Sequence, residues 1–318
     1  MATSIVNARA SVLLAAVAAL GCVSCSKLAS TPTSDGSKHQ LPEWRVPSTE
    51  SLIVHSTVAG RDYQITVALP RGYSESTARY PALYLLDANW SFPIAVETAR
   101  LLAIGPREHP NGDLSEQPVL VGIGYPVGLY RNAIPPRLKD LTPTPDPDLI
   151  REVSRNIGFS VESSGSGGAS AFLAALADDV VPEVERRYRL DSNRRSLFGH
   201  SLGGLFAVHV LFHRPELFES YLITSPALWW GQGAIWKSEE EFRQTGKELR
   251  GRVLLMSGSL DDGQLPSTKK LDDVFRSRAY RGLVWHTEVF DNETHSSVGA
   301  LSLSRGIRWL YGDLAPKS

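Results

Sequence analysis

The chain has 318 residues, of which 42% are hydrophobic and 21% charged, so one large domain or two modest ones can bury a sizeable core. The 33 basic and 34 acidic side chains nearly cancel, which leaves no basic field for a nucleic acid or an acidic membrane surface. Both cysteines, Cys22 and Cys25, lie near the N-terminus. A disulfide scaffold and a cysteine-ligated metal centre are therefore excluded, and the chemistry must come from serine, histidine, carboxylates and the backbone.

Residues 1–21 have the features of an export signal. A short polar stretch with one arginine precedes an apolar run over 11–20, which as a helix is about 15 Å long and too short to span a bilayer. Ala19-Leu-Gly-Cys22 resembles the lipobox of bacterial lipoproteins, which implies cleavage before Cys22 and lipidation of its thiol; a plain cleaved signal peptide is the alternative. Residues 22–45, rich in Ser, Thr, Pro and Gly, are typical of a flexible tether. The sequence therefore predicts an exported protein, periplasmic or anchored to the outer membrane.

Residues 46–318 predict a single domain in which strands alternate with helices. Alternation of apolar and polar residues around Gly60 predicts an antiparallel hairpin, and continuous apolar runs predict buried strands over 80–86, 118–123, 195–198, 221–224, 253–256 and 283–290. Helical patterns occupy the intervals, near 91–104, 169–188, 202–213, 234–249, 266–279 and 296–311. This order predicts an α/β fold with a mostly parallel central sheet flanked by helices.

One segment, about 125–170, interrupts this alternation. It contains Pro135-Pro136, three further prolines within 143–147 and a Gly/Ser-rich stretch at 163–168, with little sustained periodicity. Long irregular connections within a compact domain are commonly functional, and this one follows a central strand, on the side where α/β sheets carry their sites. We expect an irregular lid insertion that faces the substrate.

The chemistry begins at Gly199-His-Ser-Leu-Gly203, which fits the G-x-S-x-G pattern. The motif follows an apolar strand and opens a helix, the setting of a nucleophile elbow, in which Ser201 is pushed out on a strained turn. Small residues are needed there because the helix passes close to the strand. The backbone N–H of Leu202, at the start of that helix, is then placed to donate to an oxyanion formed on Ser201.

A serine nucleophile needs a base, and the base needs an acid that orients it. Of eight histidines, only His295 follows a late strand in the chain order Ser, acid, His that α/β-hydrolases use. Asp261 and Asp262, which follow the strand before it, compete for the role of acid. Asp291 and Glu293 are nearer His295 in sequence but are typical of solvated loop residues.

A second pair of histidines, His209 and His213, is spaced i, i+4 on a helix. This spacing occurs in metal sites, but the residues between them supply no glutamate and the helix is apolar. We interpret the pair as packing residues, and we expect no metal and no organic cofactor.

Five blocks of the chain resemble the putative-esterase family of α/β-hydrolases, which includes esterase D, the enterobactin and salmochelin trilactone esterases, and feruloyl and acetyl esterases. The blocks begin at Tyr80 (YPALYLLD), Arg137 (RLKDLTP), Gly199 (GHSLGG), Ser225 (SPALWW) and His295 (HSSV). The resemblance covers about residues 46–312 and is nearest to the periplasmic siderophore-esterase branch. It implies that Asp261 rather than Asp262 is the acid and that the N–H of Asn89 is the second oxyanion donor. The chain departs from many relatives in having Ala88 where they have glycine, which puts the geometry of that loop in question.

Three further residues are candidates for substrate binding. Trp229 and Trp230 would form an apolar wall for an aromatic or acyl group near Ser201, with packing in the core as the alternative. Arg137, with Arg131 and Lys139, lies in the lid and could bind an anionic substrate such as a catecholate siderophore, although lid cations are often simply solvated.

The sequence thus predicts an exported serine esterase that hydrolyses a small-molecule ester through Ser201, His295 and Asp261 and an acyl-enzyme. The ester would be a siderophore trilactone or a feruloyl or acetyl ester. Two alternatives remain open: acyl transfer to a sugar or lipid hydroxyl, and a non-catalytic binding lipoprotein of the same fold. The sequence does not indicate the oligomeric state.

Overall fold

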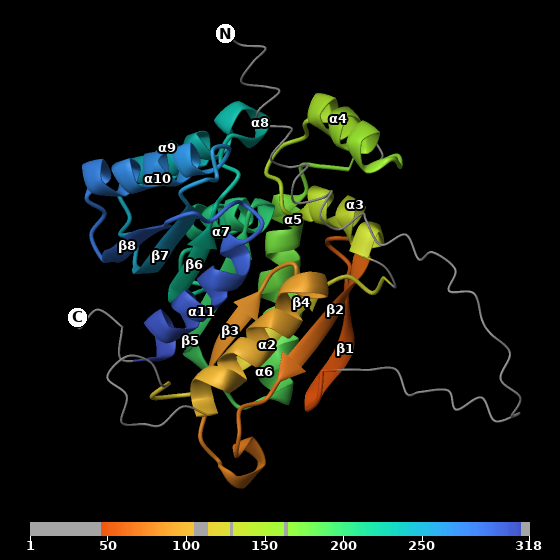
Figure 1. Ribbon diagram of the computed structural model, residues 1–318, viewed down its shortest axis with the longest axis vertical. Helices are drawn as coiled ribbons and strands as arrows, with labels where there is room; N and C mark the ends of the chain where they lie inside the picture. The colour runs from red at the N-terminus through yellow and green to blue at the C-terminus, as the bar shows by residue number, and fades with distance from the viewer. Residues whose placement is uncertain (1–45, 105–113, 128–129, 162–164, 313–318) are drawn as a thin grey trace, which may run out of the picture.

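A computed structural model describes residues 46–104, 114–127, 130–161 and 165–312. Its centre is an eight-stranded sheet in the order β1-β2-β4-β3-β5-β6-β7-β8, with helices on both faces (Figure 1). The strands are β1 (Thr49–Ser56), β2 (Arg61–Ala68), β3 (Tyr80–Leu85), β4 (Val119–Gly124), β5 (Leu190–His200), β6 (Ser220–Thr224), β7 (Gly251–Gly258) and β8 (Leu283–Phe290). The expected mostly parallel α/β-hydrolase sheet is confirmed.

The antiparallel part of the sheet is confined to its first two strands. β1 and β2 form a hairpin in which Ser56 pairs with Arg61, and β2 also runs antiparallel to β4. Every pairing from β4 through β3, β5, β6 and β7 to β8 is parallel. The carboxyl ends of the parallel strands therefore meet at one edge of the sheet, where loops and helix starts can bring distant residues together.

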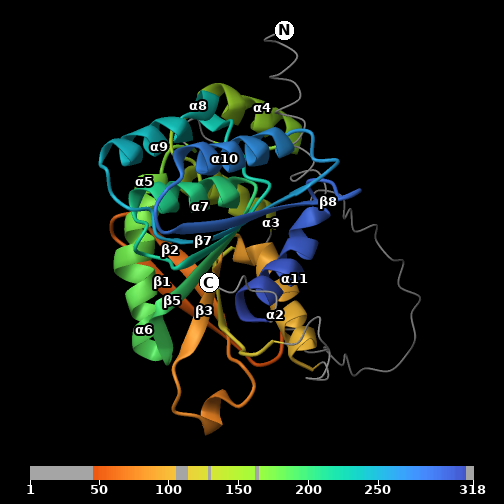
Figure 2. The same cartoon turned by 90° about the vertical axis from the view of Figure 1, so that its left-hand side faces the viewer.

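The helices cover the sheet in two layers (Figure 2). They are α2 (Ala88–Ile104), α3 (Tyr130–Asp140), α4 (Pro147–Ile157), α5 (Ala169–Ala174), α6 (Val181–Arg187), α7 (Leu202–His213), α8 (Trp230–Gly233), α9 (Ile235–Gln244), α10 (Leu265–Arg278) and α11 (Val298–Tyr311). A short 3₁₀ turn, Tyr73–Glu75, precedes β3, and a π-helical stretch, Ala175–Val180, joins α5 to α6. α2 and α11 contact each other and cover one face of the sheet, whereas α5, α6, α7 and α10 cover the other.

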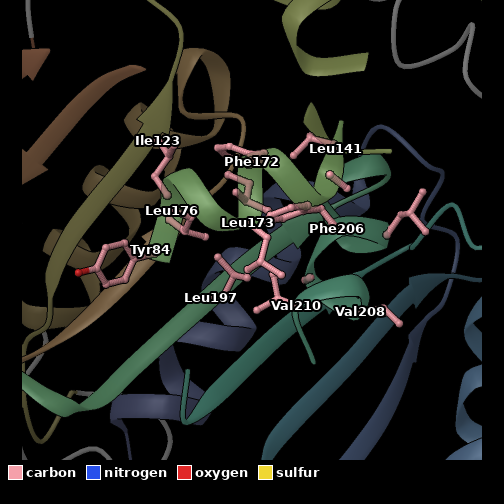
Figure 3. Packing of buried hydrophobic residues seen from close by; sticks show 14 of the residues in the cluster. Tyr84, Ile123, Leu141, Phe172, Leu173, Leu176, Leu197, Phe206, Val208 and Val210 are labelled. Carbon is pink, nitrogen blue, oxygen red and sulfur yellow. The ribbon is translucent and has the colours of Figure 1, made fainter. Parts of the chain in front are cut away.

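The position of strand β3 between two helix layers explains why its sequence is a continuous apolar run. Its side chains alternate between two cores: Tyr84 packs on the face of α5 and α7, and Leu83 and Leu85 pack on the face of α2 and α11. On the first face, the rings of Phe172 and Phe206 lie 4.7 Å apart above the sheet (Figure 3). Because both faces of the sheet are buried, apolar and polar residues do not alternate along such a strand.

The segment 125–170 is more regular than its sequence indicates. It contains α3 and α4, and both helices bury apolar side chains, with Ile134 of α3 and Val153 of α4 joining the main core. Asp146 caps α4 by accepting a hydrogen bond from the N–H of Leu149, and Gly158, at φ 75°, ends it. The expectation of an irregular insertion is wrong over these two helices, because the caps of α4 and the buried apolar side chains of both helices stabilise regular structure.

The predicted export signal, Cys22 and the tether 22–45 lie outside the described residues. The described residues contain no helix that could serve as a membrane span.

Candidate active site

Ser201 occupies the sharp turn between β5 and α7. Its backbone has φ 62° and ψ −117°, a conformation that costs energy for a residue with a side chain. The turn is held because the N–H of Ser201 donates to the carbonyl of Thr224 and the carbonyl of Ser201 accepts from Ala227. Both partners belong to the end of β6 and its following loop. The fold thus supplies the strained elbow that the motif predicts.

The glycines of the motif are required by close backbone approach. A Cβ on Gly199 would lie 2.1 Å from the carbonyl oxygen of Gly203, and one on Gly204 would lie 3.0 Å from that of Thr224. A larger residue at Gly199 would push α7 away from β5 and open the turn. The spacing of glycines around Ser201 is therefore a packing requirement of the elbow.

His295 and Asp261 lie in the loops that follow β8 and β7. Asp261 Oδ2 lies 2.9 Å from His295 Nδ1, and the side chains are buried. Asp262 is exposed, as is Asp291. Of the candidate acids, the structure brings Asp261 to the imidazole.

The two loops are locked to each other by backbone contacts. The N–H of Leu260 donates to the carbonyl of Glu293, and a Cβ on Gly258 would lie only 2.1 Å from that carbonyl oxygen. Ser259 Oγ also accepts from the N–H of Asn292. Asp261 and His295 are therefore positioned as one unit.

The atoms that would exchange a proton are buried and free. Ser201 Oγ and His295 Nε2 both have no hydrogen-bond partner within the part of the chain that the structure describes. Buried polar atoms normally find partners, and a catalytic role is one of the reasons why such an atom is left unpaired. Serine–histidine bonds commonly tighten only when substrate is bound.

The two predicted oxyanion donors begin neighbouring helices. Leu202 is the first residue of α7 and Asn89 the second of α2, and the strands that precede these helices, β5 and β3, are paired in the sheet. First-turn N–H groups have no acceptor within their own helix. The left-handed conformation in the β3–α2 turn belongs to Asp87, at φ 58°, so Ala88 is accommodated inside the helix.

A pocket of about 250 Å³ opens beside Ser201. Its walls are mostly apolar and come from α2, α3, α4 and α11, through Trp90, Ile94, Ile134, Leu138, Val153 and Leu303. Arg137, Asp87 and His200 also line it. The lid segment therefore does form one wall of the site, and Arg137 lies where a substrate-binding role requires it to be.

Asp87 and His200 are residues of the site to which the sequence analysis gave no role. Arg137 Nε donates to Asp87 Oδ1 at 2.8 Å; burial raises the pKa of the Asp87 carboxyl and the Arg137 guanidinium opposes that shift. Burial also holds the pKa of His200 far below its usual range, with the nearby His295 and Arg137 adding to the effect. The one feature of the sequence that points to a role for Asp87 in the site is its position at the end of an apolar strand.

The two tryptophans have structural contacts. Trp230 is fully buried and donates from Nε1 to the carbonyl of Thr144, which ties α8 to the lid segment. Trp229 is half-buried and donates to Oε1 of Gln264, whose own N–H bonds the carbonyl of Asp261. Neither is among the described residues that line the pocket. Core packing therefore accounts for Trp230, and Trp229 supports the loop that carries Asp261.

The other histidine pair is also placed by packing. The rings of His209 and His213 are 3.9 Å apart, and His209 is buried on α7. No cluster of three or more metal-ligating side chains is present among the described residues.

Comparison with known proteins places the chain in a family. The family described as "Putative esterase" matches residues 147–296. The ferri-bacillibactin esterase BesA of Bacillus subtilis is 31% identical over 271 residues, covering 83% of this chain and 90% of that protein. The siderophore triacetylfusarinine C esterase of Aspergillus fumigatus is 32% identical, covering 84% and 94%. The crystal structure of the BES protein of Bacillus cereus superimposes with a TM-score of 0.71 at 26% identity, covering 88% of this chain and 99% of that one. The chain thus belongs to the Putative esterase family of α/β-hydrolases and is a hydrolase of carboxylic esters.

Proposed function

We propose that this enzyme hydrolyses the ester bonds of a siderophore by nucleophilic catalysis at Ser201. The observation that carries the catalytic part is the 2.9 Å contact of Asp261 Oδ2 with His295 Nδ1, beside a serine held in a strained elbow. The substrate class is supported by relatives that align over most of their length and are named as esterases of bacillibactin and triacetylfusarinine C.

The residues divide the reaction into two steps. Ser201 Oγ attacks the ester carbonyl while His295 Nε2 takes its proton, and Asp261 holds the imidazole in the tautomer with the proton on Nδ1. The N–H groups of Leu202 and Asn89 stabilise the negative charge on the carbonyl oxygen, and loss of one such donor typically costs about 3–4 kcal/mol of barrier. His295 then protonates the leaving alcohol, and water releases the acyl group by the same route.

We further propose that the enzyme is exported and anchored through a lipidated Cys22. The lipobox resemblance at 19–22 and the composition of residues 22–45 support this location. An iron-siderophore ester would then meet the enzyme outside the cytoplasm.

A hydrolysis panel tests the substrate class. We expect kcat/KM for ferric and iron-free catecholate trilactones to exceed that for feruloyl esters and aryl acetates by at least about tenfold, a difference of 1.4 kcal/mol in transition-state binding. Rapid hydrolysis of the other esters with no cleavage of either trilactone form or of triacetylfusarinine C would contradict the siderophore assignment. Product masses measured with and without added sugar or lipid alcohols separate hydrolysis from acyl transfer.

A further inference from the structure

The lid helix α3 is joined to the turn between β3 and α2 by a buried ion pair. Arg137 Nε lies 2.8 Å from Asp87 Oδ1, and the two side chains are only 11% and 5% exposed. Asp87 is two residues before Asn89, whose N–H is the proposed second oxyanion donor. The ion pair therefore connects the lid to the backbone that would bind the developing charge.

The turn at Asp87 is otherwise held by short-range contacts. The carbonyl of Asp87 accepts from the N–H groups of Trp90 and Ser91, and Ser91 Oγ donates to the carbonyl of Leu86. The Asn89 side chain bonds the backbone N–H and carbonyl of Tyr125, both at 2.9 Å. These contacts fix the turn to itself and to the end of β4, and the Asp87 carboxylate fixes it to α3.

The Arg137 guanidinium is engaged by the protein on two sides. Besides Asp87, it lies over the Trp90 ring at 5.4 Å from the ring centroid. A buried carboxylate that loses a cationic partner becomes costly to keep ionised. Withdrawal of Arg137 toward an anionic group of the substrate would leave Asp87 in that situation.

We propose that Arg137 and Asp87 form a positioning pair, which sets the oxyanion-binding turn when α3 is seated on it. In this role Arg137 acts through Asp87 and the backbone of Asn89, and its contribution does not depend on a negative charge in the substrate. The proposal rests on the proposed esterase function, since it concerns the same oxyanion site.

A double-mutant cycle tests the pair. Arg137→Gln, Asp87→Asn and the double variant are compared with Arg155→Gln, which changes an exposed residue of α4 that donates to the carbonyl of Arg151. Each is assayed with neutral 4-nitrophenyl acetate and with anionic mono-4-nitrophenyl succinate, below the thermal midpoint of every variant. Arg137→Lys, which keeps the charge but loses the Nε bond, is the milder substitution should Arg137→Gln fail to fold.

The positioning role predicts the same loss for both esters. Each single variant should lower kcat by about ten- to a hundredfold, since displacement of a catalytic group by about 1 Å costs about a hundredfold. KM should change less than threefold, and the double variant should be no slower than the slower single one, because both remove one interaction. Arg155→Gln should match the wild type.

A different pattern overturns the proposal. If Arg137→Gln raises KM for the anionic ester alone while Asp87→Asn keeps the wild-type rate, Arg137 binds the substrate's anion and does not position the turn. If the loss of kcat in the double variant is the full product of the two single losses, the two residues do not act as a pair. Failure of the esterase proposal has another signature, namely that Ser201→Ala hydrolyses these esters as fast as the wild type.

Discussion

The imidazole rings of His200 and His295 lie 4.7 Å apart, with their planes inclined by 33°. His200 is the residue before Ser201, so the ring of the proposed base packs against the elbow that carries the nucleophile. Burial keeps the pKa of His200 far below its usual range, and the nearby His295 and Arg137 lower it further. A neutral ring in this place supports His295 without adding a positive charge when His295 takes the serine proton.

Loss of the His200 ring should impair catalysis more than binding. His200→Ala is expected to lower kcat by about tenfold or more with KM within about a factor of two, because His295 loses the contact on one face. His200→Phe, which keeps a ring there, should recover most of the rate. Steady-state kinetics with 4-nitrophenyl acetate measure this, and His213→Ala, at the exposed end of α7, is the control. A wild-type kcat for His200→Ala would refute the role.

The two adjacent aspartates should differ sharply. Asp261→Asn should lower kcat by about 10⁴-fold, since only the carboxylate bonded to His295 fixes the imidazole tautomer. Asp262→Asn, at an exposed position beside it, should stay within about a factor of two. Single-turnover acylation rates of both variants give the comparison. A large loss of kcat in Asp262→Asn, or a wild-type kcat in Asp261→Asn, would contradict the assignment of Asp261 as the acid.

His209 should make the enzyme less stable in mild acid. Burial, with a smaller effect of His213, lowers the pKa of His209 to about 3, and both its ring nitrogens lack a hydrogen-bond partner within the described residues. The unfolded chain takes up a proton as the pH falls below about 6.5, but the folded chain does not until about pH 3. The free energy of unfolding should therefore fall by about 1.4 kcal/mol per pH unit in this window, or about 2 kcal/mol at pH 5.

The variant His209→Phe isolates this contribution. Asp140, whose pKa is raised to about 6 by burial, changes stability in the opposite direction, so the measurement must be a difference. We expect the loss of unfolding free energy between pH 7 and pH 5 to be about 2 kcal/mol smaller in His209→Phe than in the wild type, by urea denaturation. The variant His286→Gln, at an exposed histidine of β8, should keep the wild-type pH dependence. Equal pH dependence in His209→Phe and the wild type would show that His209 is not held neutral.

If Cys22 carries the lipid anchor, its loss should change the location of the protein and leave its activity unchanged. Diacylglycerol on Cys22 supplies the two acyl chains that stable attachment needs, and a tether of about 20 residues spans about 25 Å. The full-length protein should sediment with membranes, and Cys22→Ser should release it with unchanged kcat/KM. Cys25→Ser is the matched control and should remain attached. Wild-type protein found wholly in the soluble fraction would leave only a cleaved signal peptide.

Features that depend on neighbouring residues could be predicted from the sequence. The elbow at Ser201 is set by glycines within four residues of it, and β3 is a continuous apolar run because both its faces are buried. Asp146-Pro147 and Gly158 mark the start and end of α4, but the prolines around this short helix leave little sustained periodicity in the sequence. The helix α3 forms despite Pro135 and Pro136, since its apolar face is buried in the core.

Features that depend on tertiary contact could not be predicted. Asp87 and Arg137 are 50 positions apart, and their ion pair forms only when α3 is seated on the β3–α2 turn. Likewise, nothing in the pair Trp229-Trp230 indicates that one ring donates to Thr144 and the other to Gln264. These contacts decide which residues support the site and which line it.

Fluorophosphonate labelling is the most direct test of Ser201 as the nucleophile. Native enzyme treated with a fluorophosphonate should gain one adduct, mapped by peptide mass spectrometry to Ser201, and lose its esterase activity in proportion. Heat-denatured enzyme and Ser201→Ala should remain unlabelled, and Ser201→Ala should retain less than about a thousandth of the wild-type rate at an unchanged thermal midpoint. An adduct on another residue, or hydrolysis by Ser201→Ala near the wild-type rate, would contradict the assignment of Ser201 as the nucleophile.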